Sequence, residues 1–333
     1  MDQLLLQGIP NFSEHLPPLG MELRIHACRR FYYICQHFDV ELRKGDYSRP
    51  RLVRYTYEYS LSGESRDNFL RFFFKAVDLQ IDGDEPISFE NIRPHFFDFA
   101  EYLFGNFFLP VKASAKKTPQ LSPASEAQSQ GQQDDGTGPR LSVLRRDCLI
   151  RDRHRCVVSR VFDLAEAEER YETPCGARDD EGRLLVDEPD DPAYLEVAHI
   201  LPHSLMQANR EGKLDPSKKS TLAILNMFDV GVAELIQGPE IDGPRNAITL
   251  TPQHHLSFGN FKVYFEHVPG TDETYTIRTF HKQSYVRRAP FPVTRELYLT
   301  QTIEPPSRRL LAVHCAIAHI LHLSGAGDYI DNI

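Results

Sequence analysis

The chain carries a long internal segment that cannot form a folded core. Between Lys112 and Arg140 it has no aromatic residue and few large aliphatic ones, and polar and small residues predominate. Such a segment buries too little apolar area to offset the entropy lost when it is ordered. We therefore predict a flexible linker over residues 111–140, which separates an N-terminal domain (1–110) from a second domain (141–333).

Aromatic residues recur at helical spacing in the N-terminal domain. Apolar side chains three and four residues apart predict helices over 22–38, 66–78 and 88–108. Residues 53–60 alternate between apolar and polar and predict a short strand. No pattern typical of catalysis occurs there. We interpret the region as a mostly helical domain that recruits or regulates the rest of the chain through a protein partner.

The charge of the chain is unevenly distributed. Its 333 residues include 38 lysines and arginines against 47 aspartates and glutamates, which gives a net charge of −9. This balance argues against a protein that coats nucleic acid over its whole surface. Much of the acidity lies in an insert over 163–191, which is typical of a solvated loop or, alternatively, of an autoinhibitory segment.

A basic cluster precedes the acidic insert. Its arginines are Arg145, Arg146, Arg151, Arg153 and Arg155. Guanidinium groups in such a cluster can contact backbone phosphates, and the alternative is a solvated helix face. The cluster therefore predicts a local nucleic-acid contact on an otherwise acidic chain.

Local signals in the second domain alternate between helix and strand, which predicts an α+β fold. Apolar spacing indicates the helices, alternation indicates the strand over 195–199, a short β-like run indicates the strand over 247–250, and Pro252 is suited to the first turn of a helix. The predicted elements are a helix over 142–154, a strand over 195–199, a helix over 219–237, a strand over 247–250, a helix from Pro252, a hairpin over 263–266 and 275–277, and a helix over 307–324.

Three polar side chains stand out on these elements. His199 lies on the first strand, Asn246 at the start of the second, and His255 on the helix that follows. A neutral imidazole can take the proton from a water that attacks phosphorus, and a second imidazole can bind a divalent cation that offsets the developing charge. An amide can hold the first histidine without titrating. The set favours phosphodiester hydrolysis.

The residues around these three side chains form ordered blocks. The blocks are Ala198-His199-Ile200-Leu201-Pro202, Asn246-Ala247-Ile248-Thr249-Leu250 and His255-Leu256-Ser257-Phe258, with Arg155-Cys156-Val157-Val158-Ser159 upstream. Their content and order resemble the HNH endonuclease family, in the variant common in fungal proteins. The resemblance covers about residues 142–290 and leaves the N-terminal domain outside.

The resemblance implies a ββα-metal nuclease domain, an endonuclease that hydrolyses phosphodiester bonds in nucleic acid, with DNA as the expected substrate. It implies that His199 is the general base, Asn246 a positioning residue, and His255 the ligand of a divalent metal. We expect Mg²⁺, with Mn²⁺ or Zn²⁺ as alternatives. Many members carry a second metal ligand directly before the base, where this chain has Ala198.

Nearby polar residues are candidates for that missing ligand. They are Glu196, His203 and Asp229. His254 is adjacent to His255 but points about 100° away on a helix, which favours a bystander. Because Mg²⁺ often keeps several waters and binds substrate phosphates, one protein ligand does not exclude a site.

Two rival classes of function remain open from sequence. One is a catalytically decayed HNH fold that binds nucleic acid or protein. The other is an interaction protein whose main work is done by the N-terminal domain. The chain has no run of 18 apolar residues and no secretory signal, so we predict an intracellular protein, nuclear or cytoplasmic, with no membrane span. The six cysteines form no C-x-x-C pair, which favours reduced, buried thiols.

Overall fold

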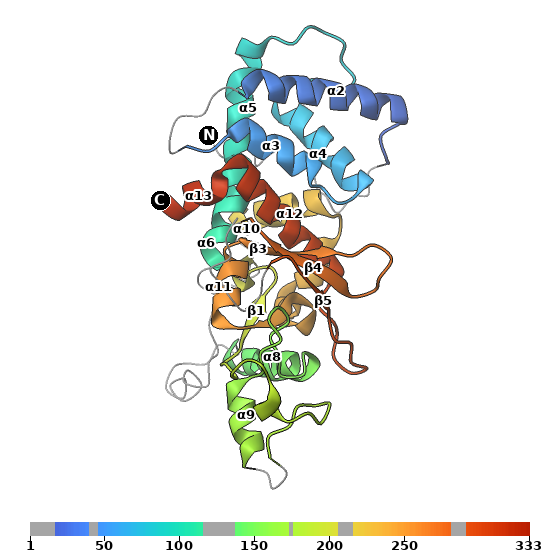
Figure 1. The fold of residues 1–333 in the computed structure, drawn as a ribbon. Helices are drawn as coiled ribbons and strands as arrows, with labels where there is room; N and C mark the ends of the chain where they lie inside the picture. The colour runs from blue at the N-terminus through green and yellow to red at the C-terminus, as the bar shows by residue number, and fades with distance from the viewer. Residues whose placement is uncertain (1–16, 40–45, 116–136, 173–175, 206–215, 281–290) are drawn as a thin grey trace. The chain divides into compact units, whose positions relative to one another are not determined.

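The computed structural model describes residues 17–39, 46–115, 137–172, 176–205, 216–280 and 291–333 (Figure 1). The chain divides into two compact units that do not follow its order. The first unit is Met1–Ala113, Ser204–Gln237 and Cys315–Ile333, and the second is Ser114–His203 and Gly238–His314. The first unit therefore takes in two segments that we assigned from sequence to the second domain.

The first unit is built from helices in its described residues. They are α2 (Met21–Phe38), α3 (Arg49–Glu58), α4 (Gly63–Ala76), α5 (Phe89–Leu103), the π-helix η1 (Phe104–Phe108), α6 (Leu109–Ala115), α10 (Pro216–Phe228), the 3-10 helix η5 (Val232–Ile236) and α13 (Ala326–Asn332). Buried aromatic rings form much of its core, where Phe31 and Phe99 each make edge contacts with both Phe69 and Phe73. The predicted helices over 22–38, 66–78 and 88–108 are confirmed, with ends shifted by a few residues.

The predicted strand over 53–60 is wrong, because this segment belongs mainly to helix α3. The Ser48 side chain accepts a hydrogen bond from the backbone of Arg51 and caps the helix, and Pro50 lies in its first turn. The buried residues of α3 include Leu52, Val53, Thr56 and Tyr57, which lie on one helical face. These buried residues recur one and four positions apart along the chain, as residues on one face of a helix do. This spacing, rather than the alternation of apolar and polar side chains, determines the structure.

The predicted linker mostly lies outside the described residues. Helix α6 covers its first residues, and α8 begins at Thr137, within its last ones. The predicted helix over 219–237 ends at Phe228, and a short 3-10 helix follows it. Within the first unit, the carbonyl oxygen of Phe228 accepts a 2.7 Å hydrogen bond from the backbone of Leu61.

The second unit contains two small antiparallel sheets. Strand β1 (Glu196–His199) pairs with β2 (Ala247–Leu250), and β3 (Val263–His267), β4 (Thr274–Thr279) and β5 (Val293–Glu296) form the other sheet. In the first sheet Glu196 lies opposite Leu250, and His199 lies opposite Ala247. Both strands and the β3–β4 hairpin lie where the sequence predicts them. The mixture of helices and small sheets confirms an α+β fold.

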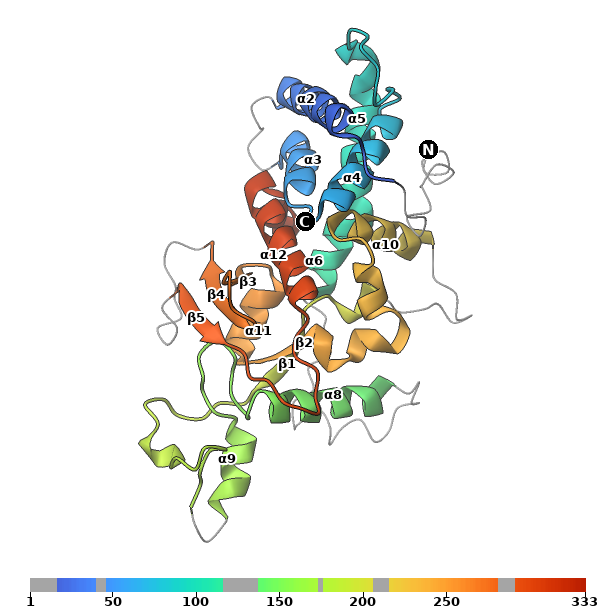
Figure 2. The same ribbon diagram turned by 90° about the vertical axis from the view of Figure 1, so that its right-hand side faces the viewer.

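Two helices cover the β1–β2 pair. Helix α8 (Thr137–Arg151) packs Leu144 and Cys148 against Val197 and Ala247, and α11 (Pro252–Gly259) contacts both strands from the other side (Figure 2). Thr251 caps α11 by accepting a hydrogen bond from the backbone of His254. Because Leu250, Thr251 and Pro252 are consecutive, the chain passes from strand to helix with almost no loop.

The acidic insert over 163–191 is not simply a solvated loop. It contains helix α9 (Leu164–Tyr171), capped by Asp163, and the 3-10 helix η3 (Leu185–Asp187). Asp163 and Asp179 are buried. Several of its carboxylates bind arginines of the same unit, so part of the chain's negative charge is neutralised internally.

Helix α12 (Arg308–Ser324) supports α11 through a buried histidine. The His314 ring stacks on Phe258 and Phe261, with centroid distances of 3.9 and 4.6 Å, and its Nε2 donates to the Phe258 carbonyl at 3.1 Å. Burial lowers the pKa of His314 to about 3, against a smaller opposing effect of that hydrogen bond.

No single helix among the described residues is long and apolar enough to cross a membrane. The bent pair of helices α12 and α13 would together be long and apolar enough, judged by length and composition only.

We predict that the free energy of unfolding falls as the pH falls from 7 to 5, because the unfolded chain protonates His314 below pH about 6.5 and the folded chain does not. This residue accounts for about 2 kcal/mol of that loss. Urea unfolding at the two pH values should show a correspondingly smaller loss for His314→Gln. The exposed His37→Gln should retain the wild-type loss. A loss in His314→Gln as large as that of wild type would contradict the assignment.

Candidate active site

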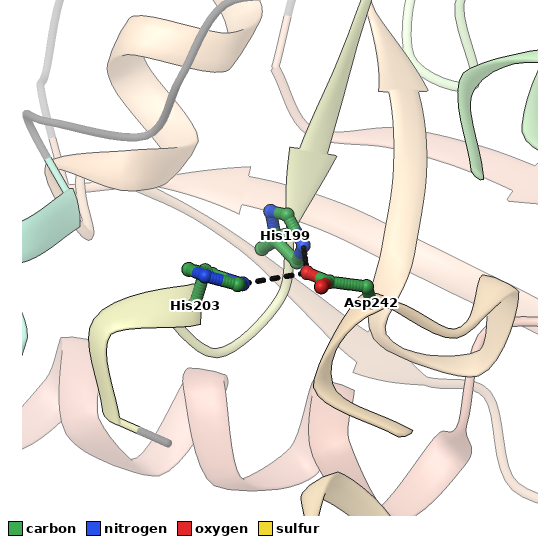
Figure 3. Close-up of side chains that lie close together, drawn as sticks. All are labelled: His199, His203 and Asp242. Carbon is green, nitrogen blue, oxygen red and sulfur yellow. Dashed lines mark hydrogen bonds and ion pairs between the residues drawn. The ribbon is translucent and has the colours of Figure 1, made fainter. Parts of the chain in front are cut away.

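His199 ends strand β1 with its side chain buried in the second unit. Only 3% of the side chain is exposed, and its Nε2 lies 3.1 Å from Asp242 Oδ1 (Figure 3). Because a carboxylate only accepts hydrogen bonds, Nε2 carries the ring proton and donates it to Asp242. Nδ1 is buried and has no hydrogen-bond partner among the described residues. The ring therefore presents one unused lone pair.

Asp242 joins His199 to a second histidine. His203, at the start of the 3-10 helix η4 (His203–Leu205), donates from Nδ1 to the same Asp242 Oδ1 at 2.6 Å (Figure 3). One donor atom from each of the three residues lies within 4.8 Å of the other two, a group that could hold a metal ion. The residues come from β1, η4 and the 3-10 helix η6 (Gly238–Asp242).

The charges of this group are set by its burial and its hydrogen bonds. Burial lowers the pKa of His199 below its ordinary value, and the hydrogen bond to Asp242 only partly opposes this. Burial raises the pKa of Asp242, but the hydrogen bonds from His199 and His203 outweigh it and hold that pKa well below its usual range. The arrangement therefore favours a neutral His199 beside an ionised Asp242.

Asn246 fixes the backbone on both sides of this group. It is fully buried and ends the 3-10 helix η7 (Pro244–Asn246). Its Oδ1 accepts from the Leu201 backbone at 2.9 Å, and its Nδ2 donates to the carbonyls of Leu201 and Ile241 at 3.0 and 2.9 Å. Leu201 follows His199 by two residues and Ile241 precedes Asp242, so one amide holds both segments in place.

His255 lies on α11 and pairs with a carboxylate of β1. Its Nδ1 lies 2.8 Å from Glu196 Oε2, and both residues are buried. Nε2 has no hydrogen-bond partner among the described residues. A histidine that donates one ring N–H to a carboxylate presents the other nitrogen in a fixed direction, as metal-binding histidines generally do.

The accessory candidate His254 has other partners. His254 Nδ1 contacts Thr251 Oγ1 at 2.8 Å and Cys156 Sγ at 3.7 Å. Burial raises the pKa of the Cys156 thiol, but the interactions with His254 and Ser159 together outweigh burial and bring that pKa down to about 7. Asp229 belongs to the first unit. His203 and Glu196 are therefore the accessory candidates whose side chains contact the candidate groups directly.

Three arginines of the predicted phosphate-binding cluster are used inside the protein. Arg145 is buried and donates to the Leu195 carbonyl at 2.7 Å. Arg155 binds Asp179 and Glu188 of the acidic insert at 2.9 and 2.7 Å.

The third of these arginines is Arg151, whose side chain is fully buried. It binds Asp152 and donates to the Pro244 and Ala247 carbonyls at 2.7 and 2.9 Å. Asp152 in turn accepts from the Thr249 backbone at 3.1 Å. This ion pair therefore ties the end of α8 to strand β2.

The other two arginines are more exposed. The Arg146 side chain is 65% exposed and pairs with the adjacent Asp147. The Arg153 side chain is 41% exposed, binds Glu181 of the acidic insert, and stacks over Tyr298. Phosphate contact from these two positions stays a prediction.

Asp242 is the residue of this site that sequence reasoning missed. It lies four residues before Asn246, in a segment rich in glycine and proline that ends in a strand. A carboxylate in such a segment is common in any surface turn. Only the folded path of the chain brings it against His199, and no local pattern indicates that contact.

One comparison with known proteins finds a match to part of the chain. Residues 156–266 match the family model described as HNH endonuclease. No curated protein and no solved structure matches the chain. The match confirms the resemblance over a segment that contains β1, β2 and α11. It indicates nuclease activity on nucleic acid, and the His199–His203–Asp242 group is compatible with the divalent metal that this family generally uses.

We predict that Arg151→Met lowers the free energy of unfolding by about 3–5 kcal/mol, because it leaves Asp152 buried without its counter-charge. Arg146→Met, on the same helix but exposed, should change it by less than about 0.5 kcal/mol. Urea unfolding at pH 7 measures both. Equal stabilities of the two variants would show that the buried pair does not hold α8 to β2.

Proposed function

We propose that the second unit is a metal-dependent endonuclease that hydrolyses phosphodiester bonds in nucleic acid, with DNA as the expected substrate. The observation that carries this proposal is the state of His199. Its Nε2 is engaged by Asp242 and its Nδ1 has no partner among the described residues, within a segment that matches the HNH endonuclease family.

His199 acts as the general base through Nδ1. A neutral imidazole whose Nε2–H is held by a carboxylate has its lone pair on Nδ1, ready to accept a proton from the attacking water. Once that proton arrives, the ionised Asp242 stabilises the imidazolium, as the carboxylate of a hydrolytic triad does. Burial that lowers the pKa of His199 keeps the ring unprotonated before the reaction.

Asn246 is a positioning residue in this scheme. Its amide holds the backbone at Leu201 and Ile241, next to the histidine and the aspartate. A base must lie within hydrogen-bond reach of the proton it abstracts, so small displacements of this backbone reduce the rate.

His255 is the proposed metal ligand, through Nε2, with Glu196 as the group that orients its ring. The donor set fits: the ring proton is held on Nδ1, and Nε2 is left for an ion. When bound, a divalent cation neutralises charge on the phosphate and polarises it. We expect Mg²⁺, with Mn²⁺ or Zn²⁺ as alternatives. In this proposal β1, β2 and α11 are the ββα unit, and Ala198 contributes no ligand.

A catalytically decayed domain that only binds nucleic acid or protein is the second candidate. The observation that favours it is the internal use of Arg145, Arg151 and Arg155, which leaves fewer cations for the substrate. Such a module would bind DNA in the presence of EDTA and leave it intact.

We predict that the full chain nicks supercoiled plasmid with Mg²⁺ or Mn²⁺ and that His199→Ala lowers the rate by about 10²–10⁴-fold, the usual effect of losing a general base. His255→Ala should lower the rate and raise the metal concentration needed for half-maximal activity. The exposed His37→Ala is the matched control and should cleave like wild type. Equal nicking by wild type and His199→Ala, or none by either, contradicts the catalytic proposal.

A further inference from the structure

His203 has no role in the proposed reaction, yet it shares a buried carboxylate with the base. We propose that His199, His203 and Asp242 form a second metal site, selective for a transition-metal dication such as Zn²⁺, whose occupation switches the nuclease off. This inference rests on the proposed function for its effect on catalysis, while the binding site itself does not.

The donor set and its spacing suit Zn²⁺. Asp242 Oδ1 lies 3.1 Å from His199 Nε2 and 2.6 Å from His203 Nδ1, and one donor atom from each of the three residues lies within 4.8 Å of the others. Tetrahedral Zn²⁺, with bonds of about 2.0–2.2 Å, needs donors about 3.3–3.5 Å apart. Binding would open the His203–Asp242 separation of 2.6 Å by about 0.7–0.9 Å and turn the two nitrogens toward one ion, which would then have three of its four positions filled.

The chemistry of these donors separates this site from the proposed catalytic one. Two imidazole nitrogens and one carboxylate suit Zn²⁺ and its neighbours, whereas Mg²⁺ prefers oxygen ligands and keeps its waters. His255 instead offers one nitrogen beside Glu196, which leaves the remaining positions to waters and phosphate oxygens. A cell-like mixture of the two ions would therefore load the sites differently.

An ion can reach the group from a surface pocket. A pocket of about 330 Å³ is lined by Asp242 together with Arg140, Asp147, Pro239 and Pro244. Asp242 Oδ2 has no hydrogen-bond partner in the described chain, and the nearest cation is Arg140 Nε at 4.0 Å. The Arg140 side chain is 47% exposed and can turn toward solvent when an ion replaces it. The ionised carboxylate supplies the negative charge that a dication needs.

Binding at this site and proton abstraction exclude each other through the tautomer of His199. Without the ion, Nε2 carries the ring proton and Nδ1 has the lone pair. An ion on Nε2 requires that nitrogen's lone pair, so the ring proton moves from Nε2 to Nδ1 and the imidazole stays neutral. His203 changes in the opposite sense, from Nδ1–H to Nε2–H. No proton is released, but Nδ1 of His199 is now protonated and cannot accept one from water.

Zinc binding is measured directly, apart from activity. Calorimetric titration of the His255→Ala chain with ZnCl₂ should show a site that is lost in His203→Gln/His255→Ala. The glutamine amide keeps a donor to Asp242 and supports the fold, but it is a poor zinc ligand. His267→Gln in the same background is the control and should bind as before. Zinc X-ray absorption should report two nitrogens and an oxygen at about 2.0–2.1 Å. Retention of that zinc site in His203→Gln/His255→Ala overturns the proposal.

The effect on catalysis is tested in Mg²⁺-dependent plasmid nicking with added ZnCl₂. Wild type should lose activity, and His203→Gln, compared with its own zinc-free rate, should need at least 10-fold more zinc for half-inhibition. Equal inhibition of both overturns the switch. A chain that binds zinc at this site but never cleaves DNA overturns the proposed function and the switch with it, while the calorimetry still decides whether the metal site exists.

Discussion

The hydrogen bond between His199 Nε2 and Asp242 Oδ1 is the interaction on which this account depends. It fixes which ring nitrogen carries the proton, and it does so in a place where only 3% of the histidine side chain and 2% of the aspartate side chain are exposed. With little water to compete, the carboxylate determines the tautomer, and the lone pair is left on Nδ1. That tautomer is the one in which Nδ1 can accept a proton, as the proposed general base requires.

Other contacts in the second unit keep His199 and Asp242 in position. Asn246 ties the backbone next to both partners, and the β1–β2 ladder places His199 opposite Ala247. Arg151 ties the end of α8 to β2 by donating to the Ala247 carbonyl, and the His314 ring stacks on Phe258 of α11. These buried polar groups each have at least one partner, which is the condition under which such groups give a structure rigidity rather than cost it stability.

Much of the site's framework could be predicted from sequence because its signals are local. Alternation predicts β1, a short β-like run predicts β2, Pro252 marks the start of α11, and the blocks around His199, Asn246 and His255 resemble a known family. Asp242 could not be predicted, because its role depends on where a glycine- and proline-rich turn places it. The internal hydrogen bonds of Arg145 and Arg151 could not be predicted for the same reason, because their acceptors are backbone carbonyls such as those of Leu195 and Ala247, distant along the chain. Residues 53–60 alternate as a strand would, yet most of them lie in α3. The Ser48 cap and the buried face of that helix outweigh so short an alternation.

The tautomer of His199 is the most direct test of the central claim. Nitrogen NMR of ¹⁵N-histidine-labelled protein at pH 7, without metal and with the signal assigned by its loss in His199→Gln, separates a protonated from an unprotonated ring nitrogen. The account predicts a neutral ring with its proton on Nε2, and a shift of that proton's position in Asp242→Asn. A ring protonated on Nδ1, or on both nitrogens, would contradict it.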